Sequence, residues 1–296
     1  MESGVLTYFR VIGLALALGA PVCCAAAPVH IVAAENFYGN VASQIAGDQA
    51  QITSILNNPN EDPHLFEVSP QGARQIARAQ IVIYSGIDYD PWIDGLLRAT
   101  KSSVRQIIDV ASLIGRKPGD NPHIWYDPAT MAAFARALAA DLTADDPAHQ
   151  ALYQQNLAAF TQSLHHLTAQ IGQLRGKYAG LPVAATEPVF GYMASALGLD
   201  MHEAGFQLAV MNNTEPSAAE VGRFEDDLRL HKVRLFIYNS QATDPAAQSM
   251  LAIARKSHIP VIGVTETMPA GVDYQGWMSN QLTALDHALG GDKTAP

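Results

Sequence analysis

The sequence predicts an α/β protein of two lobes, each a mostly parallel sheet flanked by helices, joined by one long backbone helix. Short apolar runs of strand length alternate with helical stretches in both halves of the chain, a pattern typical of parallel sheets with crossover helices. A helical run of roughly 30 residues separates the two halves, whereas an ordinary helix has about 11. The length of 296 residues also fits two domains of roughly 150 residues each.

The first half of the chain contains four expected strands and one well-marked helix. Ser69 is a suitable N-cap, and Pro70 suits the first helical position, so a helix is expected to begin there. The expected strands span residues 29–34, 51–56, 81–84 and 104–110, and the helix spans residues 70–79. Their alternation indicates a first parallel sheet.

The middle of the chain is helical. A helix is expected over residues 130–142, and Asp145-Asp146-Pro147 interrupts it. Asp146 is the expected N-cap of the next helix, residues 148–178. At a rise of ~1.5 Å per residue, that helix would measure about 45 Å and would cross the whole molecule.

The second half returns to alternating elements. Strands are expected over residues 183–186, 234–238 and 261–264, and helices over residues 189–197, 217–230, 246–256 and 274–289. The expected domain organisation is a signal peptide at residues 1–27, a first lobe at 28–145, an interlobe helix at 146–179 and a second lobe at 180–296.

The N-terminus has the features of a secretory signal. Arg10 precedes an apolar run over residues 11–20, and small residues follow up to Ala27, as in a cleaved signal peptide. A membrane anchor is the alternative, but the run is about half of the ~20 residues that a spanning helix needs. A lipid on Cys23 or Cys24 is a further alternative, although Ala20-Pro21-Val22 is a poor lipid-attachment sequence. We expect a soluble, exported, periplasmic protein.

Charge and cysteine content exclude several classes of protein. The chain has 18 Lys and Arg against 28 Asp and Glu, a net charge of -10, and it has no basic cluster. It is therefore not expected to bind nucleic acid, and it suits a cation better than an anionic polymer. Both cysteines lie in the signal region, which excludes a disulfide framework and a cysteine metal site from the mature domain.

Two loop segments resemble each other and each places a histidine directly after a proline. His64 lies in Glu61-Asp62-Pro63-His64-Leu65-Phe66-Glu67, and His123 lies in Asn121-Pro122-His123-Ile124-Trp125-Tyr126-Asp127. Proline restricts the backbone on either side, so each imidazole would be presented from a stiff loop. Ordinary loop histidines are the alternative. The repetition of the pattern favours a preformed metal site.

Two glutamates follow buried strands of the second half. Glu187 comes directly after the strand at 183–186, and Glu266 follows the strand at 261–264. In open α/β sheets the carboxyl ends of the strands face the ligand crevice. A glutamate at such a position is often simply solvated, and it is the pairing with the two histidine loops that favours a function.

Together these residues predict a site for a divalent metal. His64 and His123 come from the first lobe, and Glu187 and Glu266 come from the second. Imidazole and carboxylate groups suit divalent first-row metals, and two carboxylates would balance the charge of one M²⁺ ion. Because the ligands are spread along the chain, the two lobes would have to close on one ion.

The chain resembles the substrate-binding proteins of bacterial ABC importers for manganese and zinc, the cluster with a rigid interlobe helix. The resemblance covers nearly the whole mature chain. Its carriers are both Pro-His segments, the long helix, the C-terminal helix, Glu35-Asn36-Phe37-Tyr38-Gly39, Ser85-Gly86-Ile87-Asp88-Tyr89-Asp90-Pro91-Trp92 and Thr186-Glu187-Pro188-Val189-Phe190-Gly191-Tyr192.

The resemblance implies roles for the same four residues. His64 and His123 match the two first-lobe ligands of the family. Glu187 falls where zinc-selective members tend to have His and many manganese-type members have Glu. Glu266 falls where the family usually has Asp, which makes it the least secure ligand. The His-rich loop of many zinc-specific members is missing, since residues 111–120 contain no histidine.

The expected function is capture of Mn²⁺ or Zn²⁺ as a transported ligand, with manganese favoured, and delivery to a membrane permease and its ATPase. We expect a monomer without enzymatic activity. A secreted metalloenzyme such as a hydrolase is the main alternative, but no H-E-x-x-H, G-x-S-x-G or phosphate-loop motif is present. An adhesin or a metal buffer without a transporter is a third possibility that the sequence leaves open.

Overall fold

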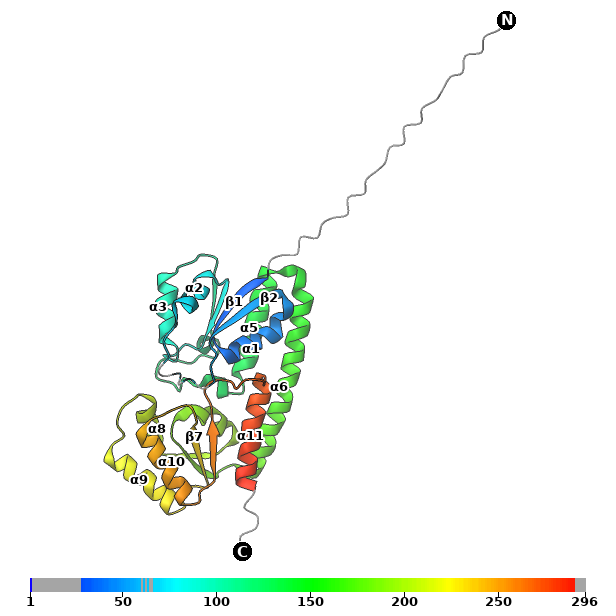
Figure 1. Cartoon of the computed structure of the whole chain (residues 1–296). Helices are drawn as coiled ribbons and strands as arrows, with labels where there is room; N and C mark the ends of the chain where they lie inside the picture. The colour runs from blue at the N-terminus through cyan, green and yellow to red at the C-terminus, as the bar shows by residue number, and fades with distance from the viewer. Residues whose placement is uncertain (2–27, 60, 62, 64–65, 291–296) are drawn as a thin grey trace.

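Two lobes lie one after the other along a single long helix (Figure 1). The computed structural model describes Met1, residues 28–59, 61, 63 and 66–290, so the expected signal at residues 1–27 lies outside the described part, apart from Met1. Each lobe contains a four-stranded sheet in which the neighbouring strands are parallel. The predicted fold class is confirmed.

The first sheet has the strand order β2-β1-β3-β4. Its central strand β1 is in register with both neighbours, and Ile31 pairs with Ile52 and with Ile81. The four predicted strands are present. The fourth begins two residues later than predicted and ends one residue earlier, where Asp109 caps the next helix by accepting a hydrogen bond from Ser112 N at 3.1 Å. The strands are β1 Val29–Glu35, β2 Ala50–Leu56, β3 Ile81–Tyr84 and β4 Gln106–Asp109.

Helices cover both faces of this sheet. The predicted N-cap at Ser69 is confirmed, since its hydroxyl accepts a hydrogen bond from Gly72 N at 3.1 Å. Three helices, α1, α3 and α4, had no counterpart among the helices predicted by position. The helices are α1 Asn36–Ala46, α2 Pro70–Arg78, α3 Pro91–Ala99, α4 Val110–Leu113 and α5 Thr130–Asp145.

The second sheet has the order β6-β5-β7-β8, which repeats the topology of the first. The three predicted strands are confirmed, and a three-residue edge strand, β6, was missed. The strands are β5 Pro182–Ala185, β6 Asp200–His202, β7 Leu235–Asn239 and β8 Val261–Val264.

The helices of the second lobe agree with the prediction, with two differences. The predicted helix 189–197 begins with a 3₁₀ turn, Pro188–Phe190, and the short helix α8 was missed because its sequence AGFQLAVM is apolar on nearly all sides. The helices are α7 Gly191–Leu197, α8 Ala204–Met211, α9 Ala218–Arg229, α10 Pro245–Lys256 and α11 Tyr274–Gly290.

The long helix α6 spans Gln150–Tyr178, 29 residues, or about 43 Å at ~1.5 Å per residue. A 3₁₀ turn, Pro147–His149, precedes it, so the prediction of Asp146 as the N-cap of the long helix is wrong. The carboxylate of Asp146 instead accepts a hydrogen bond from Tyr153 Oη at 2.8 Å and contacts the His149 ring at 2.6 Å. Asp146 thus fixes the first turn of α6 from outside through side chains.

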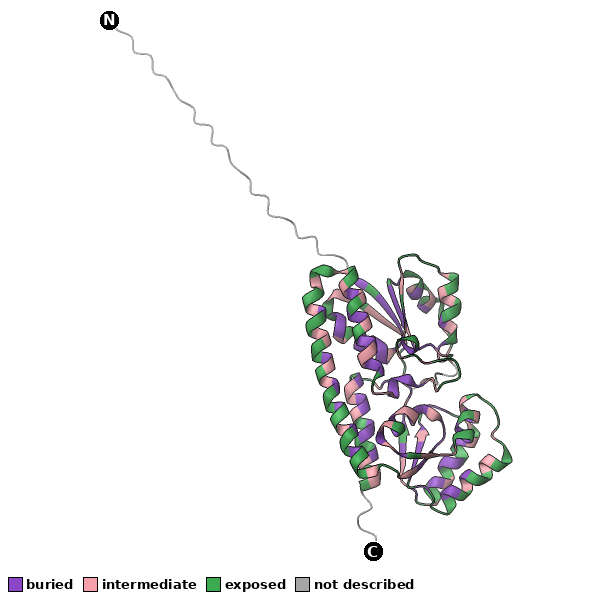
Figure 2. Ribbon diagram, turned by 180° about the vertical axis from the view of Figure 1, so that it is seen from behind, coloured by how far each residue is buried: buried purple, intermediate pink, exposed green. Residues whose placement is uncertain are grey.

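One apolar core runs through both lobes along α6. Buried side chains on one stripe of α6 join it: Phe160, Leu164, Leu167, Ile171 and Leu174. The sheets meet this core with alternate residues, such as Ile31 and Ala33 of β1. The alternating residues Val32 and Ala34 face a separate outer cluster, as the two-residue period of a strand requires. In Figure 2 the buried residues line the inner side of α6, and exposed residues line its outer side.

A buried carboxyl pair lies where β1 and β3 end. Glu35 is fully buried, and Asp90 accepts hydrogen bonds from the backbone amides of Ser85 at 2.6 Å and Gly86 at 3.0 Å. Burial raises the pKa of Glu35 well above its usual range, and the neighbouring Asp90 raises it further. Burial also raises the pKa of Asp90 to about 7. The folded protein therefore retains protons here that the unfolded chain releases.

Glu35→Gln should make stability less dependent on pH. Because both folded-state pKa values are raised, this pair favours the folded state most strongly in acid, and that contribution declines as pH rises from about 4 through about 7. The glutamine removes one titrating group, so the slope of the unfolding free energy against pH should lose the contribution of about one proton. Urea unfolding between pH 5 and pH 8 measures the slope. Glu215→Gln, an exposed control, should keep the wild-type slope; a Glu35→Gln slope equal to the wild type contradicts the assignment.

Candidate metal centre

Three of the four residues predicted as ligands lie where the loops of the two lobes meet and form hydrogen bonds with each other, a boundary that we call the seam. His123 follows β4 and α4 in the first lobe, Glu187 follows β5 and Glu266 follows β8. The carboxyl ends of parallel strands lie at one edge of a sheet, which is where such sheets bind ligands. His123, Glu187 and Glu266 are exposed by 0%, 3% and 0%, so solvent is excluded from all three.

The ring of His123 is held in one orientation. Asn121 Oδ1 lies 2.7 Å from His123 Nδ1 and also accepts a hydrogen bond from the backbone amide of His123 at 3.1 Å. An amide oxygen can only accept, so Nδ1 carries the hydrogen and Nε2 keeps its lone pair when the ring is neutral. Nε2 lies 3.5 Å from Glu266 Oε2. Metal-binding imidazoles are commonly oriented in this way by a hydrogen bond at the other ring nitrogen.

Aromatic rings form the wall behind His123. The ring centroid of Trp125 lies 5.3 Å from that of His123, and that of Tyr89 lies 6.0 Å away, both edge to face. Burial raises the pKa of Tyr89 well above its usual range, and the negative charges of Glu266 and Glu35 add to the effect. Tyr89 is therefore a neutral phenol beside the carboxylates.

One amide joins the two second-lobe carboxylates. Asn239, at the end of β7, donates from Nδ2 to Glu266 Oε1 at 2.6 Å and to Glu187 Oε2 at 3.4 Å. Its own backbone amide donates to Thr186 Oγ1 at 3.2 Å. The side chain thus holds both carboxylate groups at neighbouring strand ends without adding a charge.

Hydrogen bonds from the first lobe hold the loop that carries Glu266. Tyr126 Oη donates to the carbonyl of Thr265 at 2.7 Å. Asn36 forms a pair of hydrogen bonds with the backbone of Met268, at 2.7 and 3.0 Å. Tyr126 and Asn36 both belong to the first lobe. Glu266, the least secure ligand in the sequence, therefore lies on a loop that the opposite lobe holds in place.

A similar contact crosses the seam beside Glu187. Asn121 Nδ2 donates to the carbonyl of Pro188 at 2.7 Å, and Tyr192 Oη donates back to the carbonyl of Asn121 at 2.8 Å. Asn121 therefore fixes the ring of His123 and the loop after Glu187 at the same time. The hydrogen bonds between the lobes at this point come from a neutral amide and a hydroxyl, and the guanidinium of Arg116 lies 4.5 Å from the centroid of the Tyr192 ring.

The first Pro-His segment is only partly described, and His64 lies outside the described residues. Beside it, Phe66 packs on Trp92 with a centroid separation of 5.2 Å. Among the residues that the structure describes, no three His, Cys, Asp or Glu side chains are close enough together to hold a metal ion. The described part of the site is thus the His123–Glu266 pair, with Glu187 connected to it through Asn239.

Sequence reasoning missed the residues that organise this site. Asn239 and Gln241 were not singled out, and Asn121 and Asn36 appeared only as parts of longer segments. A signal was present, since Asn239 ends the apolar strand β7 and Gln241 lies two residues beyond it. It was weak because an amide at a strand end is common in loops.

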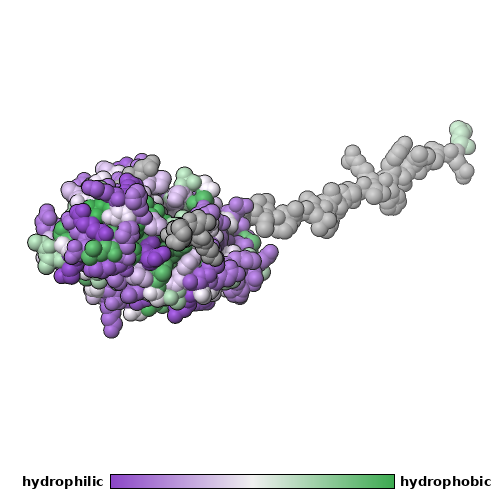
Figure 3. Space-filling model, turned by 90° about the horizontal axis from the view of Figure 1, so that it is seen from below, coloured by the Kyte–Doolittle hydropathy of each residue, from purple (hydrophilic) through white to green (hydrophobic). Residues whose placement is uncertain are grey.

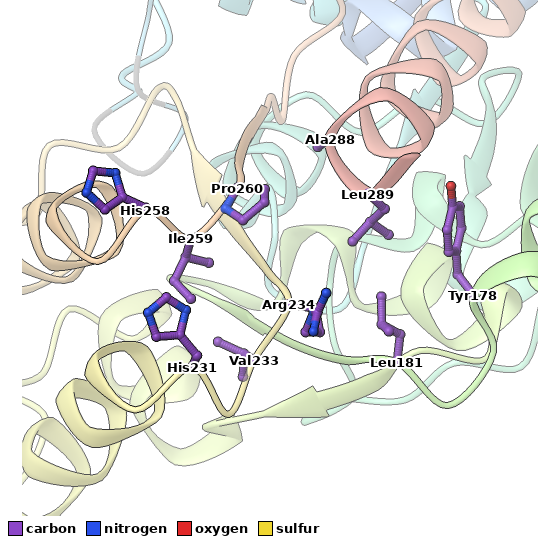
Figure 4. Close-up of a pocket in the computed structure, with 10 residues that line it drawn as sticks. All are labelled: Tyr178, Leu181, His231, Val233, Arg234, His258, Ile259, Pro260, Ala288 and Leu289. Carbon is purple, nitrogen blue, oxygen red and sulfur yellow. The ribbon is translucent and has the colours of Figure 1, made fainter. Parts of the chain in front are cut away.

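A hollow of about 270 Å³ at the far end of the second lobe contains two other histidines, His231 and His258, together with Arg234 (Figure 4). It lies where β7 and β8 begin, at the amino ends of the strands. Both histidines have positive φ angles, 53° and 57°, in the turns after α9 and α10. Such turns often have this conformation. The hollow is therefore remote from the edge where the carboxylates gather.

The chain is similar to known proteins over most of its length. The family model described as zinc-uptake complex component A, periplasmic, matches residues 31–288. The manganese ABC transporter substrate-binding lipoprotein PsaA of Streptococcus mitis is 23% identical over 285 residues, which cover 88% of this chain and 89% of that protein. The metal ABC transporter substrate-binding lipoprotein FimA of Streptococcus parasanguinis is 24% identical, with coverage of 80% and 79%.

Solved structures share the fold. The periplasmic zinc-binding protein TroA of Treponema pallidum superposes with a TM-score of 0.75 at 17% identity, and the match covers 88% of this chain and 99% of TroA. The laminin-binding adhesin Lmb of Streptococcus agalactiae gives 0.73 at 22% identity, with coverage of 88% and 99%. The resemblance inferred from the Pro-His segments and the long helix is confirmed: the chain belongs to the zinc-uptake complex component A family of metal-binding ABC importer components.

Proposed function

We propose that this protein captures a divalent transition metal, Mn²⁺ or Zn²⁺, between its two lobes and delivers it to the membrane permease and ATPase of an ABC importer. The observation that carries the proposal is the imidazole of His123, which Asn121 orients so that Nε2 faces the buried carboxylate of Glu266 at 3.5 Å. A cation between these groups would receive a lone pair from one lobe and negative charge from the other.

The proposed ligands are His64, His123, Glu187 and Glu266. Burial of two carboxylates is costly unless a positive charge compensates them, and a divalent ion supplies that charge. Asn239 contacts both carboxylates and would keep them aimed at one point. His64 enters the set through the resemblance of its segment to that of His123.

Manganese is the favoured cargo. Two carboxylates in place of a third imidazole make the ligand set harder, which suits Mn²⁺. A carboxylate can also bind through both oxygens and raise the coordination number above four. Zn²⁺ remains the alternative, since the matching family model describes a zinc-uptake component. The relative PsaA, in contrast, is described as a manganese protein.

Transport suits the geometry better than catalysis does. Catalytic metal sites keep a coordination position open for water or substrate. Here the described ligands are exposed by at most 3%, and hydrogen bonds between the lobes surround them. We therefore propose that the protein is not an enzyme. An adhesive role is not supported by any feature of the site itself.

Export to the periplasm follows from the proposed signal peptide. None of the helices in the described part of the chain is long and apolar enough to cross a membrane. The relatives PsaA and FimA are named as lipoproteins, and a lipid on Cys23 or Cys24 is therefore the alternative to the soluble form. The proposed mature chain has a first lobe at 28–145, an interlobe helix at 146–179 and a second lobe at 180–296.

We also propose that the protein is a monomer and does not bind nucleic acid. The end of the second lobe is largely hydrophilic, with only scattered hydrophobic residues (Figure 3), whereas stable interfaces usually contain a contiguous apolar patch. The net charge of -10 would repel a phosphate backbone.

Replacing a proposed histidine ligand should remove metal binding. His64→Ala and His123→Gln should each weaken the affinity for Mn²⁺ and Zn²⁺ by more than about 100-fold. Loss of a residue that only supports a ligand typically weakens metal affinity by up to about 100-fold, and loss of a ligand itself should cost more. Glutamine preserves most of the volume of His123, which is fully buried. Titration calorimetry measures the affinities, and His165→Ala, an exposed position on α6, is the control. Wild-type affinity in both variants would refute the site.

Metal should stabilise the folded protein, because the site exists only when both lobes are assembled. The expected gain is about 2.7 kcal/mol at a hundredfold excess of metal over Kd. The gain should shrink on acidification, since imidazole and carboxylate ligands must be deprotonated to bind. Thermal unfolding with added Zn²⁺, with added Mn²⁺ and with a chelator tests this. A melting temperature that does not respond to either metal contradicts the proposal.

The cargo can be identified from the metal content of protein isolated from its own periplasm. The purified protein should bind Zn²⁺ at least as tightly as Mn²⁺ in vitro, since affinity generally rises along the series toward zinc. The native preparation should nevertheless contain mainly manganese, because availability selects the metal. Elemental analysis without added metal decides between them, and zinc as the sole metal would overturn the preference for manganese.

A further inference from the structure

Gln241 is a buried amide that contacts both lobes. It lies two residues beyond the end of β7 in the second lobe and is only 9% exposed. Its Nε2 atom donates to the carbonyl oxygens of Pro59 at 2.8 Å and Glu61 at 3.3 Å, both in the first lobe. These carbonyls lie in the chain shortly before His64. The described part of that first-lobe loop is therefore anchored on a second-lobe side chain.

The same side chain fixes the loop that carries Glu266. Oε1 of Gln241 accepts hydrogen bonds from the backbone amides of Glu266 at 2.6 Å and Thr267 at 3.1 Å. Nε2 also donates to Thr267 Oγ1 at 2.6 Å. One planar amide thus uses its oxygen for the loop beside the metal site, and it divides its two hydrogens between that loop and the opposite lobe.

A third connection reaches the carboxylates themselves. The backbone amide of Gln241 donates to Asn239 Oδ1 at 3.0 Å, which leaves the Nδ2 group of Asn239 directed at Glu266 and Glu187. A hydrogen-bonded chain therefore runs from the first-lobe carbonyls through Gln241 and Asn239 to the carboxylate oxygens. Movement of the first-lobe loop away from the seam would break this chain at Gln241.

We infer that Gln241 is a positioning residue that couples contact between the lobes to the placement of the Glu266 carboxylate, and so sets how slowly the metal is released. This inference rests on the proposed metal-binding function. Gln241 is not one of the four proposed ligands. It holds the first-lobe segment at Pro59 and Glu61 against the loop at Glu266 and Thr267, so the ion leaves only after these bonds open.

The test is the rate of Zn²⁺ release from Gln241→Met. Methionine is close to glutamine in volume and cannot form these bonds. The two bonds that cross to the first lobe, to the carbonyls of Pro59 and Glu61, have a net value of about 0.7 kcal/mol each, and their loss would change the release rate about tenfold. Stopped-flow mixing of the Zn²⁺-loaded full-length protein with excess chelator measures release. We expect release about tenfold faster, with association within about twofold of the wild type.

A matched control separates positioning from general loosening. Gln207 is also buried, with an exposed fraction of 3%, and donates to the carbonyl of His202 at 2.7 Å within the second lobe. Gln207→Met should release Zn²⁺ at the wild-type rate. Unchanged release in Gln241→Met, or equal acceleration in both variants, overturns the inference while the proposed function stands. Absence of Zn²⁺ binding by the wild type would instead remove the proposed function.

A second variant keeps the test decisive if Gln241→Met does not fold. Gln241→Glu retains an oxygen for the amides of Glu266 and Thr267 but places a second oxygen against the carbonyls of Pro59 and Glu61. Repulsion between these oxygens should separate the lobes at this point, and release should again be faster than in the wild type. Release at the wild-type rate would show that the contact between the lobes has no effect.

Discussion

The burial of one side of α6 is the constraint on which the rest of the structure depends. Its apolar stripe joins a single core with the inner faces of both sheets, so the two lobes do not have separate interiors on that side. Separating them would expose this shared apolar surface to water, at roughly 25 cal/mol per Å². The helix therefore fixes the distance between the sheets, and it makes the carboxyl ends of both sets of strands face the same seam.

Neutral side chains connect the lobes at that seam. Asn36, Asn121, Gln241 and Tyr126 each bond to a backbone carbonyl of the other lobe. Buried ion pairs would require expensive desolvation, and they would compete with a bound cation for the carboxylates. Amides and hydroxyls satisfy the backbone groups without bringing a further charge to the proposed ligands Glu187 and Glu266.

The sequence by itself determined the architecture and the family, and it predicted the chemical class of the site. The two-residue period of the buried strands and the exceptional length of the apolar-striped helix around Leu164 and Leu167 reflect local geometry, which a sequence pattern records directly. The Pro-His segments predicted histidine ligands from an equally local effect, since proline restricts the backbone conformation of its immediate neighbours. Two elements without a strong local pattern were missed. The strand β6 has only three residues, and the helix α8 is apolar on nearly all sides, so neither shows a clear period.

Only the tertiary structure decided which groups meet at the seam. His123 and Glu266 are 143 positions apart in the sequence, yet 3.5 Å separates Nε2 of the one from Oε2 of the other. The extra methylene of Glu266, a reason for doubt in the sequence, is accommodated because Asn239 holds its carboxylate and Gln241 holds its backbone. The roles of Asn239 and Gln241 could not be read from the sequence, since an amide has no preferred partner until the fold supplies one. Periodicity specifies which face a residue occupies, whereas packing alone brings together residues from opposite lobes.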